Sequence, residues 1–143
     1  QTEGRSVILW LFLVVWATDI GGYVFGQWIG GAKLAPSISP GKTWAGLIGG
    51  AASAAVVAAI LLAATSVERS IMAIVALSAL VAVVSQAGDL FESWYKRRFG
   101  VKDSGQLIPG HGGVLDRIDG MLLAAPLAAI VFWLSQGGIA LWK

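Results

Sequence analysis

The sequence predicts an all-α protein, a polytopic membrane helix bundle of about four transmembrane helices with two cytoplasmic polar loops. Hydrophobic residues make up 57% of the chain and charged residues only 13%, about half the charged share of a typical soluble domain. Four apolar stretches are each long enough to cross a hydrocarbon core about 30 Å thick. The 19 glycines and seven tryptophans are also typical of membrane helices.

The four apolar stretches are separated by short polar segments. They cover residues 7–28, 44–65, 70–93 and 118–135, the last with an extension toward residue 141. We expect a single membrane-embedded domain over residues 1–143, without a separate soluble domain. Because the chain begins with glutamine rather than methionine, we expect it to be a fragment of a longer protein.

The composition excludes several classes of function. The chain has no cysteine, which excludes disulfides, thiolate zinc sites and thiol nucleophiles. Its net charge is only +2, from ten basic and eight acidic residues, so nucleic acid is not an expected partner. The first apolar run is too long for a secretory signal peptide and lacks a small-residue cleavage pattern.

The connections between the predicted helices alternate in charge. Seven basic residues lie on one side of the bundle and three on the other. Because cytoplasmic loops carry the excess of Lys and Arg, the richer side is predicted to face the cytoplasm. Both polar loops, residues 30–43 and 96–117, lie on that side.

The second helix is dense in small residues, with Gly46 and Gly50 at small-xxx-small spacing. Small residues let helices approach closely in lipid, where apolar burial gives no drive to associate. Ordinary packing within the bundle is the favoured interpretation, and a dedicated dimer face is the alternative.

Residues 89–119, here named the polar segment, stand out in this apolar chain. They hold ten of the eighteen charged side chains and the only histidine. Ionisable groups are costly at membrane depth and commonly mark functional sites there. The polar segment is therefore the first candidate for chemistry.

Two acidic residues are predicted at membrane depth. Asp19 lies within the first apolar run and either belongs to a site or locks helices through an ion pair. Asp89 begins a polar face of the third helix that Glu92, Ser93 and Lys96 continue at i+3, i+4 and i+7. Glu92 and Lys96 alone form an ordinary i,i+4 pair at a helix end. Asp89 has no cation on its own turn, so it is expected to take a metal ion or a partner from another element.

Asp116 and Asp119 are three residues apart where the fourth helix begins. One acidic residue is enough to cap a helix N-terminus, so two on one face favour a ligand pair. Antiparallel packing of the third and fourth helices would bring Asp89 close to them. Such oxygen ligands suit Mg²⁺, which is usually held by one or two carboxylates and substrate phosphates.

Basic residues and glycines between these acids are typical of a phosphate site. They are Lys96, Arg97, Arg98, Lys102 and Arg117, with Gly105, Gly110, Gly112 and Gly113. Glycines allow main-chain N–H groups to approach an anion. The alternative is that the cations anchor the helix at the membrane surface. His111 is either a phosphate donor, a proton-transfer group or only a turn residue.

The other polar loop offers Ser39, Lys42 and Thr43 just before the second helix. A helix N-terminus attracts anions, so these residues are candidates for binding phosphate. Gly41-Lys42-Thr43 resembles the end of a P-loop, but Pro36 occupies the position of the required earlier glycine. A P-loop NTPase is therefore rejected.

The polar segment resembles the signature of the phosphatidate cytidylyltransferases, also called CDP-diacylglycerol synthases. The matching positions are Ser93, Lys96-Arg97, Lys102-Asp103, Pro109, His111-Gly112-Gly113, Asp116-Arg117 and Asp119. Two further stretches look like other motifs of that family: Ser39-Pro40 with Lys42-Thr43-Trp44 and Gly46, and Gly88-Asp89-Leu90 with Glu92-Ser93. Asp19 matches the acidic residue of an earlier helix. Ala45 and Gly41 depart from the family pattern, since an acidic and a basic residue are usual there. The resemblance covers the whole chain as the carboxy-terminal half of the family.

The resemblance implies a membrane-embedded catalytic domain of phospholipid biosynthesis that converts CTP and phosphatidate to CDP-diacylglycerol and pyrophosphate. It implies Mg²⁺, held by Asp89, Asp116 and Asp19, and leaves room for a second, monovalent cation such as K⁺. It implies catalytic roles for Lys96, Lys102, Asp103, His111, Arg117 and Asp119. It implies substrate binding by Ser39, Lys42, Thr43, Ser93, Arg97, Gly112 and Gly113. The implied partners are CTP, phosphatidate or a similar lipid phosphate, and membrane lipids, with a homodimer left open.

Other functions remain alternatives. A related CTP-dependent lipid kinase, or a cytidylyltransferase for another lipid phosphate, would use the same residues. A cation pathway lined by Asp19, Asp89 and Asp116 is less favoured, because five basic side chains at its mouth oppose it. A further alternative is a chain that folds but needs upstream helices for turnover.

Overall fold

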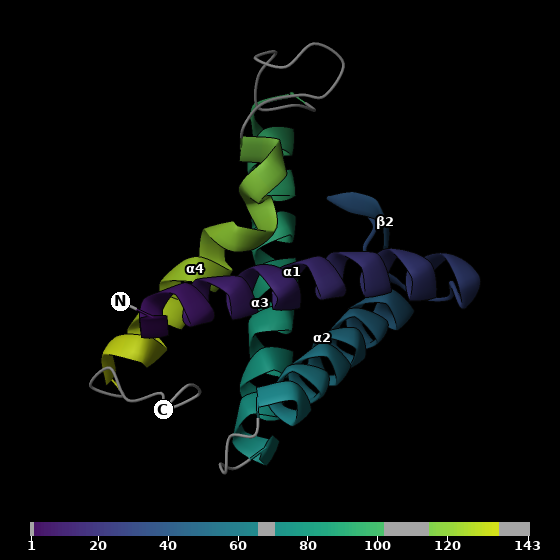
Figure 1. Ribbon diagram of the computed structural model, residues 1–143. Helices are drawn as coiled ribbons and strands as arrows, with labels where there is room; N and C mark the ends of the chain where they lie inside the picture. The colour runs from purple at the N-terminus through teal and green to yellow at the C-terminus, as the bar shows by residue number, and fades with distance from the viewer. Residues whose placement is uncertain (1, 66–70, 102–114, 135–143) are drawn as a thin grey trace.

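The computed structural model describes residues 2–65, 71–101 and 115–134, and shows four helices and one two-stranded sheet there. In chain order the elements are α1 (Thr2–Trp28), β1 (Lys33–Ala35), β2 (Ser39–Thr43), α2 (Trp44–Thr65), α3 (Ile71–Arg98) and α4 (Leu115–Leu134). In Figure 1, α1 crosses α3, α2 returns from the far end of α1, and α4 descends beside α3. The predicted all-α bundle is confirmed.

Three of the helices are long and apolar enough to cross a membrane: Gly4–Trp28, Trp44–Ala64 and Ile71–Arg98. They coincide with the first three predicted spans. The fourth predicted span is helical and apolar over Ile118–Leu134, a shorter stretch. Pro126 lies inside this helix, and membrane helices tolerate such an interruption because neighbouring groups satisfy the freed main chain.

Glycines end two of the helices by adopting the left-handed conformation that a side chain disfavours. Gly30 and Gly31 follow α1 with φ angles of 62° and 87°. Gly100 follows α3 with φ 68°, and the main-chain N–H of Val101 donates to the carbonyl of Lys96 at 3.1 Å. This is a Schellman cap, which satisfies the last carbonyls of the helix.

The loop between α1 and α2 contains an antiparallel hairpin that the sequence analysis did not predict. Lys33 pairs with Thr43 and Ala35 with Ser39. Pro36 occupies the second position of the connecting turn, which the Ile38 N–H closes on the Ala35 carbonyl at 3.1 Å. Because β2 runs directly into α2, the hairpin fixes the residues that precede the helix.

Helices α1 and α2 approach each other through small residues. A Cβ atom added to Gly46 would lie 2.7 Å from the carbonyl oxygen of Gly22 and 3.4 Å from the Cα of Gly26. The small-xxx-small spacing of the second helix therefore serves packing within this chain, as favoured from the sequence. Gly50, one turn further, faces α3: a Cβ added there would lie 2.7 Å from Nε2 of the Gln86 side chain.

The buried core lies where α1 crosses α3 and α4. Val14 and Val15 of α1 pack with Val81 of α3 and Ala124 of α4 in one cluster. At its edge the indole N–H of Trp10 donates to the Ser78 hydroxyl at 3.0 Å. This core and the α1–α2 contact together fix one side of α1 against all three other helices.

We predict that Gly46→Ala destabilises the protein by about 1–3 kcal/mol, because the new methyl group would overlap a main-chain carbonyl that no rotamer change can move. Thermal unfolding in detergent measures the loss. Gly4→Ala is the matched control, since a Cβ at Gly4 meets nothing within 4 Å. Equal midpoints for the two variants would contradict the close α1–α2 contact.

Candidate active site

A polar cavity of about 480 Å³ opens between the helices and the hairpin. Six of the residues singled out from the sequence line it: Asp19, Ser39, Lys42, Thr43, Asp89 and Asp119. They come from α1, β2, α3 and α4, so the fold gathers residues that are up to a hundred positions apart in the sequence. We refer to it below as the polar cavity.

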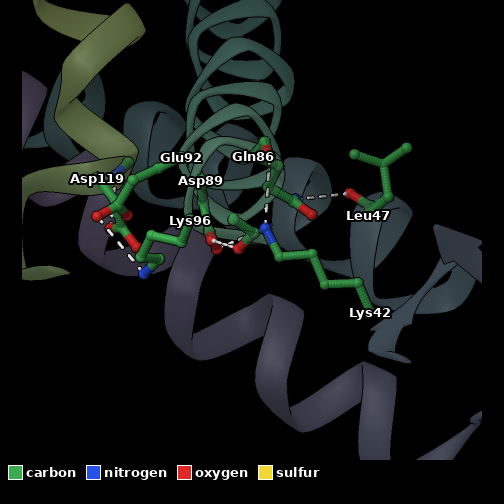
Figure 2. A network of polar contacts seen from close by, with 9 residues as sticks. Lys42, Leu47, Gln86, Asp89, Glu92, Lys96 and Asp119 are labelled. Carbon is green, nitrogen blue, oxygen red and sulfur yellow. Dashed lines mark hydrogen bonds and ion pairs between the residues drawn. The ribbon is translucent and has the colours of Figure 1, made fainter. Parts of the chain in front are cut away.

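Lys42 and Asp89 form an ion pair across the polar cavity, from β2 to α3 (Figure 2). Their side chains are 20% and 34% exposed, so the pair is partly shielded from solvent. The ammonium group of Lys42 also donates to the main-chain carbonyl of Gln86 at 3.4 Å. Asp89 was expected to take a metal ion or a partner from another element, and the structure provides the partner.

The predicted polar face of α3 is confirmed by contacts along it. The Ser93 hydroxyl donates to Asp89 Oδ1 at 3.4 Å, and Lys96 Nζ lies 3.5 Å from Glu92 Oε1. The Glu92–Lys96 pair is therefore present. Glu92, however, is only 2% exposed, so it is buried between helices rather than lying at an exposed helix end.

Asp119 joins this group from α4. Its Oδ1 accepts from the N–H of Gly120 at 2.6 Å, and its carboxyl group lies beside that of Glu92 (Figure 2). Asp19 and Asp89 are both close enough to Asp119 to repel it electrostatically. The expected approach of Asp89 and Asp119 across the α3–α4 hairpin is thus confirmed, and Asp19 belongs to the same cluster.

Thr43 has a structural task at the edge of the polar cavity. It is buried, and its hydroxyl oxygen accepts a hydrogen bond from the N–H of Gly46 at 3.1 Å. This is the bond of an N-cap residue, and it satisfies one of the free N–H groups at the start of α2. Thr43 therefore anchors the helix directly behind Lys42.

Other predicted site residues lie away from the polar cavity or outside the described part. Ser93 and Lys96 continue the face of α3 beyond it, and Arg97 is exposed at the end of that helix. Lys102, Asp103, His111, Gly112 and Gly113 fall outside the described residues, as do the side chains of Asp116 and Arg117. Their roles stay predictions.

Four polar side chains of the polar cavity were not singled out from the sequence: Thr18, Tyr23, Gln27 and Gln86. Gln86 is the one that joins two elements across it. Gln86 lines it, and its amide Nε2 donates to the carbonyl oxygen of Leu47 in α2 at 3.3 Å. Its position three residues before Asp89 puts it on the same face of α3. That spacing was the available signal, since a Gln on an otherwise apolar helix at membrane depth is itself unusual.

The acids of the polar cavity have the donor chemistry of a Mg²⁺ site. Asp19, Asp89 and Asp119 offer hard carboxylate oxygens, which this ion prefers. Within the described ranges no three acidic or histidine side chains already form a complete chelating group. Mg²⁺ typically needs only one or two carboxylates and completes its shell with water and substrate phosphates. The residues present therefore fit the ion together with a phosphate ligand.

Three curated relatives of this chain carry the same name. Proteins named phosphatidate cytidylyltransferase match at 55% identity in Brucella suis biovar 1, over 87% of this chain and 46% of that protein. The match in Haemophilus influenzae is 46% identical over 92% of this chain and 47% of the relative. The match in Staphylococcus haemolyticus is 44% identical over 92% and 50%. The chain spans about half the length of the curated relatives it matches.

A family model matches nearly the whole chain. The model described as "Cytidylyltransferase family" matches residues 1–135. That range contains the hairpin, all four helices and every residue of the polar cavity. The chain therefore belongs to the cytidylyltransferase family.

Proposed function

We propose that this protein is a phosphatidate cytidylyltransferase, which joins CTP and phosphatidate to give CDP-diacylglycerol and pyrophosphate. The observation that carries the proposal is the polar cavity, where three carboxylates and a lysine converge between helices apolar enough to span a membrane. The names of the relatives support the same reaction.

The location of the polar cavity suits two substrates of opposite character. The acyl chains of a lipid phosphate hold it in the bilayer with its phosphate at the membrane surface, whereas CTP arrives from water. A polar cavity bounded by membrane-spanning helices gives both a meeting place. Because CTP is a cytoplasmic nucleotide and the polar loops are rich in Lys and Arg, we propose that this end faces the cytoplasm.

In the proposed reaction a phosphate oxygen of phosphatidate attacks the α-phosphorus of CTP. A new P–O bond forms as the bond to the β-phosphate oxygen breaks, and pyrophosphate leaves with that bonding pair. A phosphate oxygen is already nucleophilic at neutral pH, so the protein needs no strong general base. Its task is to position the two phosphates and to neutralise their charge.

Among the described residues, Lys42 is the cation that lines the polar cavity, and it is proposed to contact a phosphate there. Ser39 lines the same wall and offers a hydroxyl donor. Lys96, Lys102 and Arg117 are proposed to add positive charge from the polar segment. His111, Asp103, Gly112 and Gly113 are proposed to complete the phosphate cradle.

Asp89 and Asp19 are proposed to hold Mg²⁺, with Asp119 and Asp116 as the α4 contributors. When bound there, the ion would offset the negative charge of the triphosphate. Ser93 is proposed to support Asp89, since its hydroxyl donates to that carboxylate. A homodimer and a second, monovalent cation are compatible with this proposal.

The fate of labelled CTP tests the reaction. We predict that CTP labelled at the α-phosphate transfers its label to a phosphatidate-derived lipid in vesicles, while γ-labelled CTP releases its label as pyrophosphate. Thin-layer chromatography of the lipid fraction measures the first label, and chromatography of the aqueous fraction measures the second. Label passing from the γ-phosphate to the lipid would instead identify a lipid kinase, and ion flux without CTP binding a cation pathway.

Asp89→Asn is expected to lower CDP-diacylglycerol formation by about 100-fold or more, because the site loses a negative charge proposed to hold Mg²⁺. Asp116→Asn is expected to act in the same way. Activity is measured across a Mg²⁺ titration in the complete protein. Size-exclusion chromatography in detergent checks that each variant is folded; near-normal turnover in a folded variant would refute the metal assignment.

Lys42→Met should lower kcat/KM for CTP by about ten- to a hundredfold, the range expected for loss of a charge-assisted contact to a phosphate. Lys33→Met is the matched control, since Lys33 belongs to the same hairpin but is exposed. Initial rates at varied CTP concentration measure the effect. A loss of equal size in both variants would show that general positive charge, rather than the position of Lys42, matters.

A further inference from the structure

We propose that Gln86 is a positioning residue that holds Lys42 in register with Asp89. The expected effect on turnover rests on the proposed function. The expected effect on the position of α2 and Lys42 does not depend on that function. Gln86 is half-buried on α3, three residues before Asp89, and it lines the polar cavity. It contacts the hairpin through its main chain and α2 through its side chain.

The side chain ties α3 to the first turns of α2. The Leu47 carbonyl can only accept a hydrogen bond, so the NH₂ end of the Gln86 amide must be the end that faces it. The packing leaves space for this contact because position 50 is glycine. A Cβ at Gly50 would lie only 2.7 Å from Gln86 Nε2. The amide therefore lies directly against the surface of α2.

The main chain of Gln86 reaches the same functional group from the other side. Its carbonyl accepts a hydrogen bond from Lys42 Nζ at 3.4 Å, next to the Lys42–Asp89 ion pair. Lys42 stands two residues before α2 begins, and Leu47 lies in the first turns of that helix. Gln86 thus links both the lysine and the helix that follows it to the backbone that carries Asp89 (Figure 2).

These contacts separate Gln86 from an ordinary interhelical bond. Trp10 and Ser78 also join two helices by a hydrogen bond to α3, at 3.0 Å. Both residues are buried, and neither lines the polar cavity. Losing that bond should affect stability alone. Losing the Gln86 side chain should also let the start of α2, and Lys42 with it, shift relative to Asp89.

The experiment compares Gln86→Met, which keeps side-chain length but removes the donor, with Ser78→Ala in the complete protein in lipid vesicles. We expect Gln86→Met to lower kcat for CTP by about ten- to a hundredfold, as misplacement of a reacting partner does. KM for CTP should change by less than about threefold, because Lys42 still meets the triphosphate. Ser78→Ala should leave both constants within about twofold of wild type.

A double-mutant cycle tests whether Gln86 acts through Lys42. In a Lys42→Met background, adding Gln86→Met should cause no further loss of kcat, since the residue that it positions is gone. Additive losses, or an equal loss of kcat in Ser78→Ala, would overturn the proposal.

Hydrogen–deuterium exchange decides the structural part without any turnover. The main-chain amides of residues 44–50 should exchange faster in Gln86→Met than in wild type. In Ser78→Ala they should exchange at the wild-type rate. Unchanged exchange in Gln86→Met would refute the positioning role. If the wild-type protein does not turn over CTP, the proposed function is refuted. The exchange result would still decide the positioning role of Gln86.

Discussion

The ion pair between Lys42 and Asp89 is the constraint on which the site depends. A carboxylate at membrane depth is costly unless a cation, a metal ion or water accompanies it. The hairpin of β1 and β2 supplies this cation, because it places Lys42 beside Asp89 of α3. Thr43 then caps α2 immediately behind that lysine. The charge of Asp89 therefore helps to fix where the loop before α2 must lie.

The close approach of α1 and α2 supplies the other half of the arrangement. Small residues at the crossing bring the two main chains together, and Asp19 on α1 then faces the same space as Asp89 and Asp119. Three acids of like charge stabilise nothing by themselves, because each raises the electrostatic cost of the others. Lys42 offsets part of that charge through its ion pair with Asp89. The remaining excess of negative charge supports the proposal that the polar cavity binds a metal ion together with phosphates.

Much of the fold was predictable because a bilayer imposes long apolar runs, and the helix bounds followed from them closely. The approach of Asp119 to Asp89 was also predictable, because antiparallel packing of the third and fourth helices brings these positions together, whereas the place of Asp19 was left open between a site and an ion pair. The hairpin was not, because strands of three and five residues, one containing Pro40, give no clear alternation. Gln86 was missed for a related reason: its two partners, Leu47 and Lys42, are about 40 positions away in sequence. Contacts of that kind depend on how helices cross, which local pattern does not encode.

The glycines at the α1–α2 crossing have a consequence for how the polar cavity can accommodate ligands. Gly22, Gly26 and Gly46 form part of its wall, so main-chain atoms bound the space there. A wall of main chain has no rotamers and cannot retract, whereas the rest of the lining consists mostly of side chains. Any adjustment to the size of a bound molecule must therefore come from these side chains and not from the helix crossing. The polar cavity is therefore rigid where α1 and α2 cross.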